Sequence, residues 1–256
     1  MGEHAKQHHA EADTLRGGLD AGLSLIDTAE MYGDGGAERV VAEAISGRRD
    51  EAFLVSKVSP HHATKSGTVA ACERSLKRLQ TDRIDMYLLH WRGTVPLADT
   101  MEAFNRLQNT GKIRYFGVSN FDTTDMQDWC ALAGGDATAA NQILYNLLRR
   151  GPEHELLPWC AARRIPIMAY TPLEPVRERT AHALRNVAAR FEATPAQVAL
   201  AWLLQPPGVM VIPKAARGSH VHENRAALDL QLNADDLAEL DAAFPMPAGA
   251  TPLAMR

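Results

Sequence analysis

The sequence has little of several features that would assign a protein to a familiar class. It contains only three cysteines, Cys72, Cys130 and Cys160, and no two of them have CxxC spacing. Such a sparse, odd set argues against a disulfide framework and fits a protein of the reducing cytoplasm. No run approaches the ~18 apolar residues of a membrane span. The first ten residues, "MGEHAKQHHA", contain no apolar stretch, so we expect no secretion signal.

An excess of positive charge and a nucleotide-binding glycine loop are also missing. The chain has 27 Lys and Arg against 31 Asp and Glu, a net charge of −4, so bulk charge would not attract nucleic acid or an anionic membrane. At 46% hydrophobic and 23% charged residues, the composition is that of an ordinary globular protein. We therefore expect no nucleic-acid or membrane partner. The sequence leaves the oligomeric state open, and a monomer that acts on small molecules is the expectation.

Short apolar runs recur along the chain at intervals of roughly 30 residues, which is typical of βα units with a parallel sheet. These predicted strands lie within residues 23–29, 52–58, 84–90, 113–119, 138–144, 165–170 and 208–213. The segments between them have apolar residues at helical spacing. We predict helices in residues 10–18, 65–80, 98–110, 122–133, 152–163, 195–205 and 234–244, with Asp122, Thr194 and Asn233 as N-caps of three of them.

The alternation of strands and helices predicts an α/β fold, a (β/α)8 TIM barrel in a single domain over residues 1–256. The pattern contains seven strands, and residues 1–9 contain no candidate for a buried strand, so strand 1 is missing from the N-terminus. A doubly wound open sheet is the structural alternative. That fold normally has a GxGxxG turn after its first strand, and this sequence has none.

Polar side chains stand at the ends of the predicted strands, where the active site of a parallel barrel lies. They are Asp27, Lys57, His90, Ser119 with Asn120, Gln142, Tyr170 and Lys214. Tyr32 follows Asp27 by five residues, in the loop "AEMYGDGG". We expect all these side chains to face one rim.

Four of these residues have a chemistry that suits proton delivery to a carbonyl group. Lys57 is costly to bury unless it is paired, and Asp27 is its natural partner. A neighbouring ammonium favours the phenolate, so we expect Lys57 to lower the pKa of Tyr32 and make it a general acid. A neutral His90 would donate to the substrate oxygen.

Each residue also has a structural interpretation. Asp27 and Lys57 are equally well read as a structural ion pair, His90 as a hydrogen-bonded core residue and Tyr32 as a surface aromatic. The convergence of all four on one rim favours a functional site.

Six motifs occur in order and carry a resemblance to a known family: "LIDTAEMYG", "FLVSK", "YLLHW", "GVSNF", "NQILYN" and "IPKA" followed by "EN". From Met1 to the C-terminus, the chain resembles the aldo-keto reductases, and most closely their bacterial methylglyoxal reductase-like branch. The resemblance implies NADPH-dependent reduction of small aldehydes or ketones, including 2-oxoaldehydes such as methylglyoxal. It also implies that Asp27, Tyr32, Lys57 and His90 form the catalytic tetrad, with Tyr32 as the proton donor.

The resemblance further implies an NADP(H) site without a Rossmann domain. Ser119, Asn120 and Gln142 would hold the nicotinamide carboxamide, and Tyr170 would stack on its ring. The segment that begins at Thr171 and ends at Leu173 would lie along the pyrophosphate. Lys214 would bind the 2′-phosphate, and Glu223 with Asn224 would hold the adenine. Trp91 would line the substrate pocket. Taken singly, these residues could equally be turn formers, strand caps or solvated charges.

The chain departs from the family pattern at several positions. Ala215 stands where many members have Ser, and His220 where many have Arg, so Arg217 is the candidate for the second phosphate-binding cation and NAD(H) is not excluded. The initial hairpin and first strand of the family are also missing. An alternative function is therefore a catalytically silent NADPH-binding or sensor protein, or an inactive truncated form.

A metal-dependent hydrolase fits less well than either of these functions. Such an enzyme would need carboxylates or imidazoles where Lys57 and Tyr32 stand. The "HVH" sequence at 220–222 has no third ligand nearby, and we predict no metal site.

Overall fold

The computed structural model describes residues 1–255, which form two compact units. The first unit comprises Met1–Asn141 together with Ala216–Gly218. The second comprises Gln142–Ala215 and the described residues from Ser219 onward.

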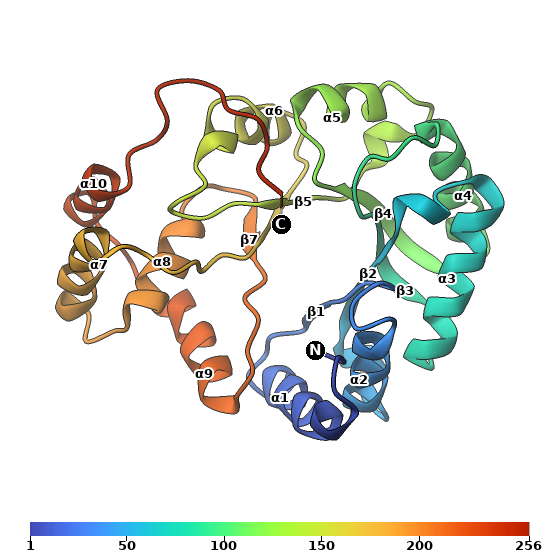
Figure 1. Ribbon diagram of the computed structural model, residues 1–256, viewed down its shortest axis with the longest axis horizontal. Coiled ribbons are helices and arrows are strands. Elements are labelled where there is room, and N and C mark those ends of the chain that lie inside the picture. Colours follow the sequence, from blue (N-terminus) through green and yellow to red (C-terminus); the bar gives the residue numbers. More distant parts are fainter. Residues whose placement is uncertain (256) are drawn as a thin grey trace. The chain divides into compact units, whose positions relative to one another are not determined.

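The first unit contains four neighbouring parallel strands in sequence order (Figure 1). Their register places Leu25 opposite Phe53, Val55 opposite Met86, and Ile84 opposite Ile113. All six residues of β3 are buried, as expected for a parallel strand covered on both faces. The strands are β1 (Leu25–Asp27), β2 (Phe53–Val58), β3 (Ile84–Leu89) and β4 (Ile113–Ser119).

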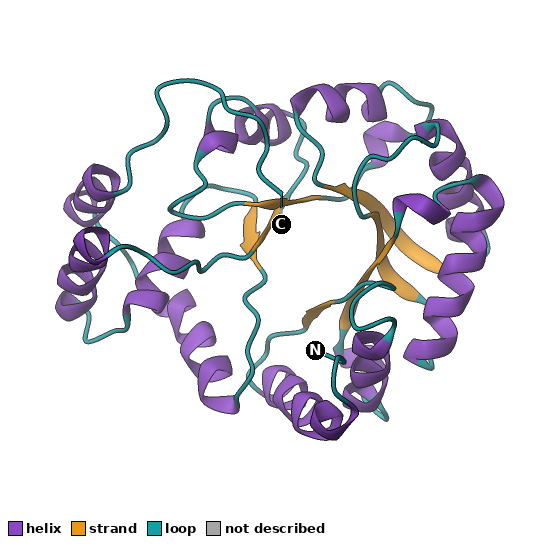
Figure 2. Ribbon diagram, viewed as in Figure 1, coloured by secondary structure: helices purple, strands orange, loops and turns teal. Residues whose placement is uncertain are grey.

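Helices connect these strands, and α3 and α4 run along one side of them (Figure 2). The Thr64 side chain accepts from the Gly67 amide to cap α3, and Asp122 accepts from the Asp125 amide to cap α5. The helices are α1 (His8–Asp20), α2 (Gly36–Ile45), α3 (Lys65–Leu79), α4 (Leu97–Asn109) and α5 (Thr123–Cys130). The 3-10 turns are η1 (Ala5–Gln7), η2 (Arg49–Glu51), η3 (Pro60–His62) and η4 (Gly135–Ala137).

Aromatic side chains fill the core between these helices and strands. Phe104 of α4 lies 5.7 Å from Phe116 of β4 and 6.1 Å from Trp129 of α5, measured between ring centroids. The indole N–H of Trp129 donates to the Thr138 hydroxyl at 2.7 Å, so its buried polar atom has a partner. This packing joins β4 to α4 and α5.

The second unit has the strand order β5-β6-β7. Strands β6 and β7 are parallel, with Ile167 opposite Val209. Thr194 and Asn233 form capping boxes at two of its helices. The strands are β5 (Asn141–Leu144), which belongs to this unit from Gln142 onward, β6 (Ile167–Tyr170) and β7 (Val209–Val211). The helices are η5 (Gly151–Glu153), α6 (Leu156–Ala162), α7 (Glu178–Arg190), α8 (Pro195–Leu203), α9 (Gly218–Ala226), η6 (Ala227–Asp229) and α10 (Ala234–Ala243).

The structure confirms the parallel α/β class and a strand inside each of the seven predicted runs. The three predicted N-caps, Asp122, Thr194 and Asn233, are confirmed as well. The predicted helix at 152–163 is divided, because η5 ends at Glu153 and α6 begins at Leu156. Among residues 1–255, no helix is long and apolar enough to cross a membrane.

Candidate active site

Lys57 and Asp27 form a buried ion pair at the carboxyl ends of β2 and β1. The Lys57 ammonium donates to the two carboxylate oxygens of Asp27 at 2.8 and 2.7 Å, and to the carbonyl oxygen of Thr28 at 2.9 Å. Lys57 is 0% exposed. A buried cation is tolerated here because all three of its N–H groups have acceptors. The predicted pairing of these two residues is confirmed.

Tyr32 lies in the turn between β1 and α2, where several residues adopt the left-handed backbone conformation with positive φ. Gly33 and Gly35 have φ of +56° and +76°, values that glycine adopts without strain. The turn is closely packed, since a Cβ on Gly36 would stand 2.0 Å from the carbonyl oxygen of Gly2. The Tyr32 ring is thereby held with its centroid 4.9 Å from the Lys57 ammonium.

His90 follows β3 directly and faces the Tyr32 hydroxyl. Its Nε2 lies 3.5 Å from the Tyr32 oxygen, and its ring meets the phenol ring edge-on at 5.6 Å between centroids. Its Nδ1 is buried and has no hydrogen-bond partner among residues 1–255. A protonated Nδ1 would leave a buried donor unsatisfied, so we place the proton on Nε2, which points toward Tyr32.

The two titratable rings respond differently to burial. Burial, and then the Lys57 ammonium, lower the pKa of His90 to about 3, so the imidazole is neutral near pH 7 as predicted. Burial raises the pKa of Tyr32, and the opposing effect of Lys57 is smaller. Our expectation that Lys57 would bring this pKa below its ordinary value was therefore wrong. The raised pKa keeps the phenol protonated at neutral pH, so its proton is available.

The low pKa of His90 predicts a specific loss of stability in acid. Its folded-state pKa lies near 3 and its unfolded value near 6.5, so the unfolded chain binds one proton more between these values. Stability due to this residue is thus present above pH 6.5 and lost as the pH falls. Between pH 6.5 and 4.5 we expect the native protein to lose about 2 kcal/mol more unfolding free energy than His90→Gln does. Urea denaturation at both pH values measures this, with the exposed His61→Gln as control. An equal loss in both variants would contradict it.

Three other predicted residues of the first unit lie next to this cluster. Asn120, at φ +59°, donates its side-chain amide to the carbonyl oxygen of His90 at 3.0 Å and to the Ser119 hydroxyl at 3.2 Å. Ser119 ends β4 and is 1% exposed. The Trp91 ring lies 5.0 Å from that of His90. Arg217 also belongs to the first unit and is exposed.

The remaining predicted cofactor residues belong to the second unit, where they lie in or beyond its strands. Gln142 is a buried residue of β5, Tyr170 ends β6, and Lys214 is exposed after β7. The others are Thr171, with φ +46°, Leu173, which is exposed, and Glu223 with Asn224 in α9. Within this second unit, an aromatic ring, amides, a hydroxyl and an exposed ammonium have the chemistry that suits the ring, carboxamide and phosphates of NADP(H).

Glu30, a buried neighbour of this cluster, was not among the residues predicted from the sequence. Its side chain is 7% exposed, and it accepts from the Ser59 amide at 2.9 Å and from His62 Nδ1 at 2.8 Å. Glu30 lies within the motif "LIDTAEMYG", two residues before Tyr32. Its position between a buried strand and a candidate catalytic tyrosine is the sequence feature that could have identified it.

Comparison with known proteins identifies the family of the chain. The profile of the Aldo/keto reductase family matches residues 2–244, which contain all four side chains. The chain belongs to the aldo/keto reductase family. The family predicted from the six sequence motifs is therefore confirmed.

Individual proteins resemble the chain over most or all of its length. It is 48% identical to "Methylglyoxal reductase YeaE" of Escherichia coli (strain K12), with 100% of this chain and 92% of that protein covered. It is 32% identical to "Glyoxal reductase" of Bacillus subtilis (strain 168), with 90% of this chain and 82% of that protein covered. A crystal structure of an aldo/keto reductase from Klebsiella pneumoniae in complex with NADP and acetate matches with a TM-score of 0.97 at 51% identity, covering 100% of this chain and 92% of the other.

Proposed function

We propose that this aldo/keto reductase catalyses the NADPH-dependent reduction of small aldehydes or ketones, with 2-oxoaldehydes such as methylglyoxal as the leading substrate class. The observation that carries the proposal is the position of the Tyr32 hydroxyl, which faces a neutral His90 and lies in the turn beside the buried Lys57. The names of the E. coli and B. subtilis relatives support the substrate class.

In this proposal each of the four side chains has one role. Tyr32 donates its proton to the carbonyl oxygen of the substrate, acting as a general acid. The His90 Nε2–H donates a hydrogen bond that orients the same oxygen. Lys57 stabilises the negative charge that Tyr32 acquires, because an ammonium favours a neighbouring phenolate. Asp27 holds Lys57 in place.

NADP(H) supplies the hydride when it is bound. Ser119, Asn120 and Gln142 are proposed to hold the carboxamide, and Tyr170 to stack on the nicotinamide. The proposed contacts of the remaining cofactor groups are Thr171, Leu173, Lys214, Arg217, Glu223 and Asn224. The Klebsiella structures in complex with NADP and with NADPH support this cofactor.

The finer features of the prediction form part of the same proposal. We infer that the parallel strands are those of a (β/α)8 barrel forming one domain, because a single family profile extends over residues 2–244. Trp91, whose ring adjoins His90, is proposed to line the substrate pocket. That the protein is cytoplasmic and monomeric also remains a prediction.

The proposed activity is tested by mixing the purified protein with NADPH and methylglyoxal and following absorbance at 340 nm. We expect a decrease that depends on both the protein and the aldehyde, and that is slower with NADH because Lys214 and Arg217 favour a 2′-phosphate. The catalytically silent alternative would be supported by a different result. NADPH would quench the tryptophan fluorescence, and no turnover would be seen with aromatic, sugar or 2-oxo aldehydes.

A further inference from the structure

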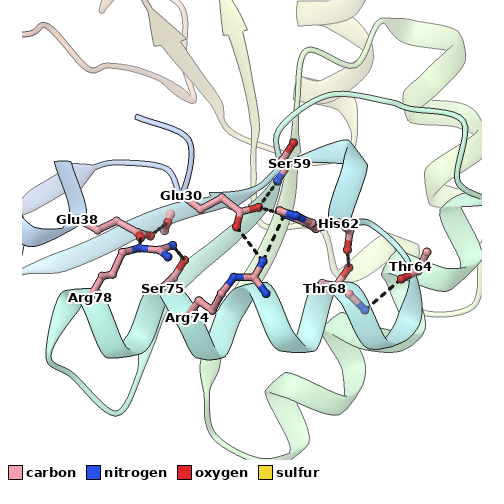
Figure 3. Close-up of polar contacts among 11 residues, drawn as sticks. Glu30, Glu38, Ser59, His62, Thr64, Thr68, Arg74, Ser75 and Arg78 are labelled. Atoms are coloured by element: carbon pink, nitrogen blue, oxygen red, sulfur yellow. Dashed lines mark hydrogen bonds and ion pairs between the residues drawn. The ribbon is translucent and has the colours of Figure 1, made fainter. Parts of the chain in front are cut away.

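The buried carboxylate of Glu30 bridges the two segments that carry Tyr32 and Lys57. Its Oε1 accepts from the Ser59 backbone amide at 2.9 Å, just after β2 (Figure 3). Glu30 lies two residues before Tyr32, and Ser59 lies two residues after Lys57. The hydrogen bond therefore connects the turn that carries the phenol to the strand end that carries the ammonium. On each side, the bonded residue is only two positions along the chain from the one that carries the functional group.

The bridge is anchored on helix α3. The same Glu30 oxygen accepts from His62 Nδ1 at 2.8 Å, and the other oxygen lies 3.4 Å from an Arg74 guanidinium nitrogen (Figure 3). The His62 carbonyl oxygen accepts in turn from the Thr68 hydroxyl at 3.2 Å. Because Arg74 and Thr68 both belong to α3, a rigid helix supports the carboxylate.

The other end of the Tyr32 turn is held on the same face of α3. Glu38, which is 0% exposed, accepts from Arg78 Nε at 2.5 Å and from the Ser56 hydroxyl at 2.8 Å. Arg78 follows Arg74 by one helical turn, so the two arginines project from one face of α3. The segment from Glu30 to Glu38 is thus held at both ends by hydrogen bonds to α3 (Figure 3). Tyr32 lies two residues after the start of this segment.

We propose that Glu30 is a positioning residue that sets the separation between the Tyr32 phenol and the Lys57 ammonium. The inference rests on the proposed function, in which that separation governs proton donation. A buried carboxylate with a backbone N–H, an imidazole and a guanidinium as partners is well suited to this task, because its oxygens accept from several donors at once. The Glu30 side chain itself does not touch the reacting groups.

The test compares three substitutions of Glu30 in the full-length protein. In Glu30→Ala the Ser59 amide loses its acceptor and the turn is released, so we expect kcat with methylglyoxal to fall roughly tenfold to a hundredfold. We expect the dissociation constant of NADPH, measured by fluorescence quenching, to change less than about twofold, since the cofactor residues are untouched. Glu30→Gln keeps an oxygen acceptor for Ser59, and we expect it to recover most of the loss.

Glu30→Asp covers the case in which the alanine variant does not fold. It keeps the charge but is one methylene too short to span the same gap, so we expect a kcat closer to that of Glu30→Ala than to that of Glu30→Gln. A normal kcat in both Glu30→Ala and Glu30→Asp would overturn the inference.

Asp85 provides a matched control in the same unit. Its carboxylate is also buried, and it also bonds one backbone amide, that of Leu54 at 2.8 Å, and one guanidinium, that of Arg49 at 2.7 Å. It lies at the opposite ends of β2 and β3 from Lys57 and His90, so Asp85→Ala should cost stability without lowering kcat. An equal loss of kcat in Asp85→Ala and Glu30→Ala would show a merely structural role and overturn the inference.

Different results would reject the proposed function and the role of Glu30. Full activity of Tyr32→Phe would reject the proton-donor role itself. An inactive Tyr32→Phe together with a fully active Glu30→Ala would reject only the role of Glu30.

Discussion

Replacing Tyr32 with Phe is expected to lower the turnover of methylglyoxal with NADPH by about 10²–10⁴-fold, the range contributed by a positioned general acid. The substitution removes one oxygen and leaves the aromatic ring. The ring contacts with His90, at 5.6 Å between centroids, and with the Lys57 ammonium, at 4.9 Å, can therefore persist. We expect NADPH binding to stay within about twofold of the native value, because loss of a group that acts in the transition state affects kcat.

The matched control for this prediction is Tyr115→Phe. Tyr115 belongs to the same unit, is 39% exposed, and stacks on Phe53 at 6.2 Å between centroids. The same loss of a hydroxyl group there should leave turnover unchanged. Turnover and binding are measured by absorbance at 340 nm and by tryptophan quenching. If Tyr32→Phe keeps the native rate, the proton comes from another group.

Replacing Lys57 with Met should reduce both activity and stability. Lys57 is 0% exposed and forms two short bonds to Asp27, so its loss takes the cation away from that carboxylate. Breaking a buried pair on one side typically costs 3–5 kcal/mol, and we expect a loss of about that size in urea denaturation. We also expect turnover to fall by at least about 10²-fold, since no cation then favours the Tyr32 phenolate.

A double variant separates the two effects. Adding Asp27→Asn to Lys57→Met removes the negative charge that the Lys57 ammonium had neutralised, and we expect about 2 kcal/mol or more of the unfolding free energy to return. Turnover should remain low, because the cation beside Tyr32 is still missing. Recovery of turnover along with stability would show that Lys57 acts only as a structural residue.

The strands and several of their end residues could be read from the sequence because these signals are local. Apolar runs such as "IDMYLLH" mark buried strands whatever packs on them, and His90 marks the point where β3 leaves the core. Thr194 and Asn233 cap helices through bonds to amides within three residues, so their role is also visible locally. The pairing of Lys57 with Asp27 followed from the cost of burying one charge alone. Helices α2 and α7 were missed although both are amphipathic, a local pattern that the sequence displays.

Other features depend on contacts between distant segments. The direction of the Tyr32 pKa shift was mispredicted, because a sequence shows which charges are near but not how much water is excluded. Glu30 was overlooked because its partners, Ser59 and Arg74, lie 29 and 44 residues away.

The sequence by itself determined the parallel α/β class, the family, and the identity of the four side chains proposed to act on the substrate. Each of these depends on residue type and order, which a linear chain displays in full. Only the tertiary structure decided two finer points: burial raises the pKa of Tyr32 in spite of Lys57, and the buried, unpartnered Nδ1 of His90 places the ring proton on Nε2. Desolvation decides both points, and it depends on everything that packs around an atom rather than on its neighbours in the chain.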